Sequence, residues 1–269
     1  MNAAPVAPVA VEDLQCAYMP VWEVKRGALT TYVCLARGNQ TEASLYEAHK
    51  TLFAGQAAEE KLRMDIGVLN YVIDELKDME AAGRKLFVVC PVQLETLHNF
   101  KNYERYKAAC DAIPLSCRPF LIFLVMMDEQ MRLPTKETYW FAAPLKQYCC
   151  QVFSELLMRK DMNFQYIKHA GIDAVGVRFH KTSGSEQDAI NMLTAFDSRA
   201  KYFKIRKSFV FGVETLSATT SLICAGFDYL GGGAIHDDVA HPDTVHRYRY
   251  EDLVSELLPA DKTDIPDQG

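Results

Sequence analysis

The chain has 269 residues, of which 49% are hydrophobic and 24% are charged, and its formal net charge is −6 at pH 7. These totals fit one large barrel or two small domains, with a composition ordinary for a packed globular protein. A negative net charge without a dominant basic stripe argues against a nucleic-acid partner. The longest strongly apolar run, residues 119–127, is too short to span a membrane.

The predicted strands are short runs of mostly apolar residues, as in buried parallel sheets. They cover residues 32–35, 85–90, 120–127, 174–179, 208–213 and 229–235, after an extended stretch from residue 18. Helices are predicted over residues 62–76, 92–112, 185–196 and 216–225, and the boundaries within residues 138–158 stay open. Strands that alternate with helices indicate parallel βαβ units. About seven such units in one chain indicate a closed (β/α) barrel.

The cysteines and the ends of the chain indicate the redox environment, the cellular location and the domain bounds. None of the eight cysteines forms a CxxC pair, and several lie in apolar runs, so we expect reduced, mostly buried thiols. A redox-active pair formed by the adjacent Cys149 and Cys150 stays an open alternative. With no signal-peptide pattern, we expect a cytoplasmic protein. Residues 1–12 are predicted to be a flexible arm, 13–258 a single domain and 259–269 a flexible tail.

Several segments resemble motifs of one known family. They are YMPV at residues 18–21, TYVCLAR at 31–37, DIGVL at 65–69, KLFVVCPVQL at 85–94, GVET at 212–215 and FDYLGG at 227–232. In order and spacing they resemble motifs of the EAL domain family, bacterial phosphodiesterases that hydrolyse cyclic di-GMP. The resemblance covers residues 17–258 and implies a TIM-like (β/α) barrel of the EAL type.

The resemblance also implies where the family's functional residues fall. The family's first glutamate falls on Val33, its asparagine on Val88, its third-strand glutamate on Ile122, its aspartate pair on Glu155 and Leu156, its lysine on Gly176, its base-bearing glutamate on Phe211 and its glutamine on Gly231. The family uses two divalent cations held by oxygen ligands. Only Glu155 keeps an acidic group, so the resemblance implies a degenerate site with no catalytic residue, no metal and no cofactor.

A second register is open between residues 130 and 210. Residues 203–210 (FKIRKSFV) are locally similar to the family's L-K-I-D-R-S-F-V, which would move the aspartate pair to Val177 and Arg178. Phe211 then follows Lys204 by only seven positions, whereas a parallel crossover needs about a dozen residues or more. We therefore prefer the first register, and the site lacks its carboxylates in either.

Two other features point to ligands. Arg37 matches the family's phosphate-contacting arginine, so it and Leu35 in the same segment are the expected contacts if cyclic di-GMP binds. Residues 234–246 (AIHDDVAHPDTVH) hold metal-ligand residue types without a standard spacing, which we interpret as a polar loop near the barrel mouth, with a metal site as the alternative.

We expect a non-catalytic regulatory protein that acts in bacterial signalling through an unknown protein partner. Inactive relatives in the family bind partner proteins, and the resemblance implies such a role here. One alternative is a cyclic di-GMP sensor without turnover, and another is a metal-dependent enzyme of a different kind. Homodimers are common in the family, so the resemblance makes a homodimer a further expectation.

Overall fold

The computed structural model describes residues 14–37, 44–127, 143–158, 164–179, 185–247 and 249–257. The predicted arm at residues 1–12 and the predicted tail at 259–269 lie outside the described residues, and the domain bounds stay predictions. Within the described ranges, no helix is long and apolar enough to cross a membrane.

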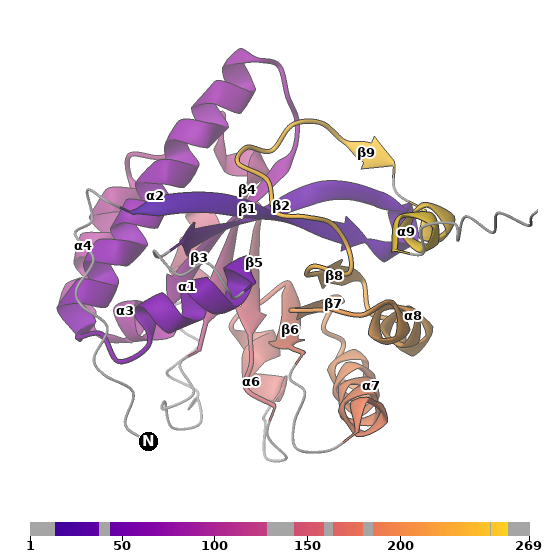
Figure 1. Ribbon diagram of the computed structural model, residues 1–269. Helices are drawn as coiled ribbons and strands as arrows, with labels where there is room; N and C mark the ends of the chain where they lie inside the picture. The colour runs from indigo at the N-terminus through magenta and orange to yellow at the C-terminus, as the bar shows by residue number, and fades with distance from the viewer. Residues whose placement is uncertain are drawn as a thin grey trace, which may run out of the picture.

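The strands close into a barrel with one reversed member (Figure 1). The barrel strands are β1 (Gln15–Glu23), β2 (Ala28–Arg37), β3 (Phe87–Gln93), β4 (Leu121–Met126), β5 (Gln151–Glu155), β6 (Ala174–Arg178), β7 (Lys207–Phe211) and β8 (Tyr229–Gly231). Neighbours from β2 to β8 pair in parallel, and β1 pairs antiparallel with both β2 and β8. The predicted TIM-like (β/α) barrel is confirmed, although the reversed direction of β1 does not follow from the alternation of strands and helices.

The helices follow the strands along the chain, and Figure 1 shows α2, α4, α7 and α8 on the outside of the barrel. Their bounds are α1 (Leu45–Phe53), α2 (Ala58–Ala81), α3 (Leu94–His98), α4 (Phe100–Cys110), α6 (Phe164–His169), α7 (Glu186–Tyr202), α8 (Leu216–Ala225) and α9 (Tyr250–Leu257), with short 3₁₀ turns η2 (Val24–Arg26), η3 (Arg118–Phe120) and η4 (Ala143–Gln147). The open segment at residues 138–158 thus contains η4 and β5, and its first residues lie outside the described ranges.

Two predicted elements are divided or shortened in the structure. The helix predicted over residues 92–112 is two helices, because Asn99 leaves the helical conformation and caps α4 by accepting a hydrogen bond from the Asn102 N–H. The strand predicted over residues 229–235 ends at β8, because Gly232 has a φ of 142° and a Cβ there would lie 2.4 Å from the backbone of Val213.

Side chains of the barrel strands divide between the interior and an outer layer under the helices, since successive residues point to opposite faces. The inner cluster contains Met19, Val21, Val33, Leu35, Val89, Ile122, Leu124, Met126, Phe153, Ala174, Phe209, Phe211 and Tyr229, with Leu45 and Tyr46 of α1. The ring centroids of Phe153 and Phe209 lie 5.6 Å apart, and those of Phe209 and Phe211 lie 4.6 Å apart. Aromatic rings therefore fill much of the barrel.

The chain after β8 crosses the outer face of the first two strands (Figure 1). Val239 and Tyr18 of β1 exchange two backbone hydrogen bonds of 2.8 Å. Farther on, the Tyr32 hydroxyl donates to the Thr244 carbonyl at 3.1 Å, and β9 (His246–Arg247) pairs antiparallel with β2. The segment predicted as a polar loop near the barrel mouth thus has two parts. Residues 236–238 line a pocket at the mouth, and the residues after them run along the outside of the barrel.

Candidate functional site

The carboxyl ends of β2 to β8 meet at one end of the barrel, here named the mouth. Barrels of this kind place their functional groups at this end. The inward-facing residues near it include Leu35, Gln93, Met126, Glu155, Arg178, Phe211 and Gly231. Gln93, Glu155 and Arg178 are polar, and the rest are apolar or glycine, so the floor of the mouth is a small polar group on an apolar interior.

Most of the predicted site positions face the barrel interior, at the mouth or below it, and Ile122 lies near the start of β4 at the opposite end. Those that face the interior are Val33, Ile122, Glu155, Gly176, Phe211 and Gly231. A Cβ on Gly176 would lie 2.1 Å from the Phe209 ring, so an aromatic side chain fills the place where the resemblance expects a lysine. Apolar side chains and glycine offer no oxygen ligand to a hard cation.

Val88 and Leu156 do not face the interior. Both belong to the outer cluster, and on β3 the inward residue is Val89. Because side chains alternate along a strand, a shift of one residue reverses the face. The placement of the asparagine position on Val88 is therefore wrong by one residue for an inward-pointing group. Val89 is equally unable to bind a cation, so the chemical conclusion does not change.

The order of strands agrees with the first of the two registers. Residues 207–211 form a single strand, β7, which leads directly into Gly212. The helix α7 lies before this strand, between it and β6. Under the second register a crossover would have to fit between residues 203–210 and Phe211, and the structure has none there.

Helix α1 lies across the mouth, although it follows β2 in the chain. The Tyr46 ring packs edge-on against Phe211 with centroids 5.7 Å apart, and the Tyr46 hydroxyl donates a hydrogen bond to Glu155. The Lys50 ammonium lies 2.7 Å from the other carboxylate oxygen of Glu155. A further ion pair, 2.6 Å long, joins Glu47 to Arg178. The helix therefore contacts the ends of β5, β6 and β7.

The beginning of α1 is fixed by hydrogen bonds to its free N–H groups. Ser44 caps the helix by accepting from the Glu47 N–H at 3.4 Å, and the Asp238 carboxylate lies near the start of the helix, where the Leu45 N–H lowers its pKa against the larger effect of burial. Carboxylates are favourable at this end of a helix because of its dipole. The loop after β8 therefore lies beside the start of α1.

His49 attaches the middle of α1 to β2. Strand β3 pairs with β2 only from Thr31 to Val33, so the Ala36 N–H farther along that edge needs another acceptor. His49 Nδ1 accepts it at 2.9 Å. Burial lowers the pKa of His49 to about 3, and the Lys50 charge acts in the same direction, so the imidazole is neutral and carries its proton on Nε2.

Glu155, the one acidic group kept at the predicted positions, is fully enclosed. Only 1% of its side chain is exposed, and both of its oxygens contact α1, through Tyr46 and Lys50. Burial, followed by the Glu155 charge, raises the pKa of Tyr46 well above its usual range, so the hydroxyl stays protonated and donates. The carboxylate therefore holds the protein's own helix.

The two residues expected to contact a nucleotide, Leu35 and Arg37, lie in different environments. Leu35 is buried in the inner cluster, while Arg37 is exposed at the end of β2. Burial, helped by the Glu214 charge, raises the pKa of Asp238 to about 6. The Leu45 N–H and the Arg37 charge both act to lower it. Arg37 alone of this pair remains open to a phosphate.

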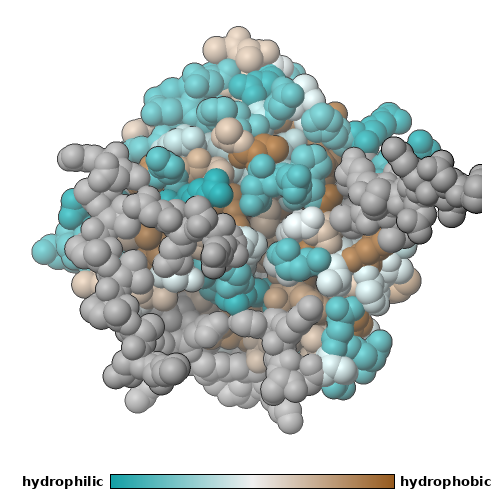
Figure 2. Space-filling model, in the orientation of Figure 1, coloured by the Kyte–Doolittle hydropathy of each residue, from teal (hydrophilic) through white to brown (hydrophobic). Residues whose placement is uncertain are grey.

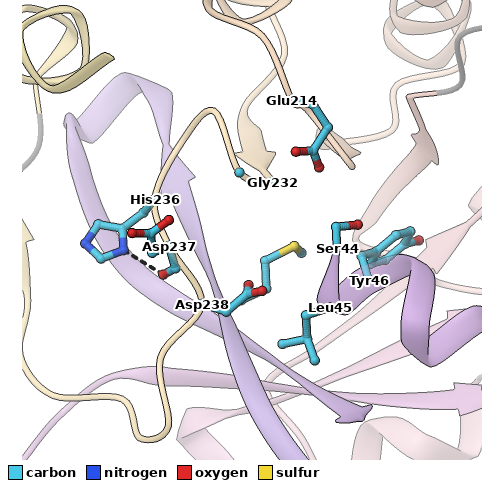
Figure 3. A pocket seen from close by; sticks show the side chains of 10 residues that line it. Ser44, Leu45, Tyr46, Glu214, Gly232, His236, Asp237 and Asp238 are labelled. Atoms are coloured by element: carbon cyan, nitrogen blue, oxygen red, sulfur yellow. Dashed lines mark hydrogen bonds between the residues drawn. The ribbon is translucent and has the colours of Figure 1, made fainter. Parts of the chain in front are cut away.

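A small pocket of about 160 Å³ opens beside α1 (Figure 3). Glu214 and Gly232 line one side, and Ser44, Tyr46 and Asp238 face them across it. Pockets that bury drug-sized ligands hold roughly 300–1,000 Å³. This pocket is therefore too small to enclose a cyclic dinucleotide while α1 stays in place.

The structure does not gather the histidines and aspartates of residues 234–246 into one site. Asp238 lies at α1, whereas His241 Nδ1 lies 2.8 Å from Glu75 of α2 and His246 belongs to β9. Across the described residues, no group of three or more His, Cys, Asp or Glu side chains is placed to hold a metal ion.

The adjacent thiols at the start of β5 are poorly suited to redox chemistry. Burial raises the pKa of Cys149 to about 12 and that of Cys150 to about 11. Each donates to a backbone carbonyl, at 3.3 Å to Leu145 and 3.1 Å to Leu121. Since the thiolate is the reactive form, both are expected to be inert near neutral pH.

The fold and the mouth define a closed (β/α) barrel with a reversed first strand, an aromatic interior and a mouth crossed by the helix after β2. No family model and no curated protein sequence matches the chain. Solved structures do match it, and proteins with EAL domains are among them.

The PaMucR phosphodiesterase, solved as a c-di-GMP complex, has a TM-score of 0.64 at 15% identity over 84% of this chain and 96% of its own. The Bacillus subtilis YkuI protein, solved with substrate c-di-GMP and calcium, has a TM-score of 0.63 at 15% identity over 92% of this chain and 59% of its own. The FimX EAL domain of Pseudomonas aeruginosa bound to c-di-GMP scores 0.59 at 16% identity over 89% and 94%. The chain therefore has the barrel fold of EAL domains, as its motifs imply.

Proposed function

We propose that this protein is a degenerate, non-catalytic EAL-like regulator that acts by protein–protein interaction in bacterial signalling and does not hydrolyse cyclic di-GMP. The EAL fold supports the link to signalling by this nucleotide, because solved neighbours are c-di-GMP complexes. A cytoplasmic location and an unknown protein partner are parts of the same proposal, in keeping with the free cysteines of the described chain.

The observation that carries the proposal is the composition of the mouth. Hydrolysis of a phosphodiester by two cations needs several oxygen ligands that converge on one point. Here the inward-facing positions that the resemblance assigns to ligands hold Val33, Ile122 and Phe211. The remaining carboxylate, Glu155, contacts Tyr46 and Lys50 of α1. One enclosed carboxylate offers too few ligands for a pair of cations.

Hydrolysis at high protein concentration tests the proposal. The purified chain and the PaMucR phosphodiesterase as a positive control are incubated with cyclic di-GMP and Mg²⁺ or Mn²⁺, and linear product is followed by chromatography. We expect product from the control alone. Product that scales with the amount of this chain would refute the non-catalytic role. Size-exclusion chromatography with light scattering tests the proposed homodimer on the same preparation.

A sensor that binds cyclic di-GMP without turnover is the second candidate. It is favoured by the exposure of Arg37 at the mouth, where a guanidinium can bind a phosphate through two hydrogen bonds. The variant Arg37→Ala should then lose affinity, whereas Arg84→Ala, in the connection between α2 and β3, should not. An unchanged affinity in Arg37→Ala would remove this support. A metal-dependent enzyme of another kind stays the weakest candidate, and metal analysis of the purified protein tests it.

A further inference from the structure

The contacts between α1 and the barrel combine charged groups with apolar side chains. Charged groups come from both sides, Lys50 and Glu47 from the helix and Glu155 and Arg178 from the strands. The apolar part is made by buried side chains of the helix, Leu45, Tyr46, Leu52 and Phe53. Charges are costly to bury even when they are paired, and each regains water when the pair separates, so the charged part of the interface separates with a smaller loss than an apolar part of equal area.

Two features beside these ion pairs favour movement of α1. Among the described residues, His49 Nε2 is buried with no hydrogen-bond partner, and an unsatisfied buried donor lowers the stability of the docked helix. Gly55, between α1 and α2, has a φ of 73° with nothing within 4 Å of its Cβ position. Glycine tolerates most values of φ, so the backbone can rotate at this position once the 3.3 Å hydrogen bond from the Gln56 N–H to the Phe53 carbonyl is broken.

From these contacts we infer that α1 is a lid on the barrel mouth, hinged at residues 54–57, which opens while the barrel stays folded. The ion pairs of Glu155 and Arg178 with α1 are its latch. Opening uncovers a floor of Gln93, Glu155 and Arg178, which suits a polar ligand or a polar side chain of a partner. The inference concerns access to the mouth, so it stands whether or not the protein binds or hydrolyses cyclic di-GMP.

Buried methionines report on the opening without a label. Met126 and Met19 are 1% and 2% exposed and lie in the inner cluster by the mouth, whereas Met64 is 1% exposed and lies in the outer layer on α2. Peroxide converts an accessible methionine to its sulfoxide. If the lid opens, Met126 and Met19 of the native protein oxidise faster than Met64. Peptide mass spectrometry measures the rate of sulfoxide formation at each methionine.

The latch variant Glu155→Gln keeps the shape of the side chain but leaves the Lys50 charge unpaired. We expect it to speed the oxidation of Met126 on the order of tenfold while that of Met64 stays unchanged, because breaking one half of a buried pair is strongly unfavourable. The variant Tyr46→Phe, which removes one hydroxyl, should act in the same direction and serves if the first variant fails to fold. The matched control is Glu95→Gln, which breaks the 2.5 Å pair with buried Lys61 outside α1.

Three outcomes would overturn the lid. Equal oxidation rates for Met126 and Met64 in the native protein would mean that α1 leaves only when the barrel unfolds. A latch variant that speeds all the methionines together would report general destabilisation. An effect of Glu95→Gln on Met126 as large as that of Glu155→Gln would show that the latch has no special role.

Discussion

The filled interior can be tested by adding one carbon atom to it, at Gly176. A Cβ there would lie 2.1 Å from Cδ2 of Phe209, whereas carbon atoms pack at about 3.5–4.0 Å. The ring would have to move by more than about 1 Å. Phe153, stacked on it at 5.6 Å, and Phe211, at 4.6 Å, restrict that movement. We therefore expect Gly176→Ala to lower the free energy of unfolding by about 1–3 kcal/mol, as overpacked cores do.

A double-mutant cycle identifies the cause. Phe209→Ala alone should cost about 3–5 kcal/mol because it leaves a cavity. In the double variant the added methyl group enters that cavity, so the loss should be smaller than the sum of the single losses by about 1 kcal/mol or more. Urea denaturation followed by circular dichroism measures all four proteins. A stability of Gly176→Ala within about 0.5 kcal/mol of the native protein, or strict additivity, would refute an aromatic ring packed over this position.

The remaining predictions concern α1, the thiols and the mouth. His49 has a pKa of about 3 when folded and 6.5 when unfolded, so the unfolded chain binds more protons between these values. The free energy of unfolding then falls as the pH falls, by up to about 1.4 kcal/mol per pH unit. Urea titrations of His49→Gln at several pH values should lack this part of the pH dependence. Cys150 and Cys224 are both exposed, but the pKa of Cys150 is raised to about 11, so alkylation at pH 7.5 should modify Cys150 on the order of tenfold more slowly than Cys224; equal rates in mass spectrometry would contradict this. Arg37→Glu should leave the melting temperature nearly unchanged, because a surface charge contributes roughly 0–1 kcal/mol; a large fall in differential scanning fluorimetry would show that Arg37 is structural.

The barrel was predictable because its strands are local patterns. Residues 85–90 and 120–127 are apolar throughout and become β3 and β4 with small changes at their ends. In contrast, β5 reads QVFSE, in which polar residues interrupt a short strand, so its boundaries stay open in the sequence. The reversed direction of β1 depends on pairing with both β2 and β8, and periodicity within one segment carries no information about pairing direction.

The sequence places some of the candidate positions in the barrel interior but does not indicate the contacts that surround them. The positions of Val33 and Phe211 follow from motif spacing, and the structure places both in the inner cluster. The contact of Tyr46 with Glu155 joins residues 109 positions apart, so no local pattern indicates it. The placement of Val88 failed because resemblance fixes a position only to within about one residue, while the face of a strand changes at every residue.

The surface offers less guidance than the mouth. Figure 2 shows hydrophilic and hydrophobic residues interleaved over the coloured part of one face, with the hydrophobic ones in small groups. Scattered exposed apolar residues are normal on soluble domains. The most exposed large apolar side chains are separated along the chain: Phe100 begins α4, Leu115 lies in the turn before η3, and Tyr202 ends α7. A partner therefore has to be found by experiment.

The most direct test of the central claim is a calorimetric titration of cyclic di-GMP into the purified protein. It is run with Mg²⁺ or Mn²⁺ and again with a chelator, and the final mixture is examined for linear product. We predict no product under any condition and no heat that depends on the metal, because the mouth holds apolar side chains and one enclosed carboxylate. Heat without product would support the sensor, with Arg37 as its first contact. Metal-dependent product would contradict the proposed loss of the catalytic site.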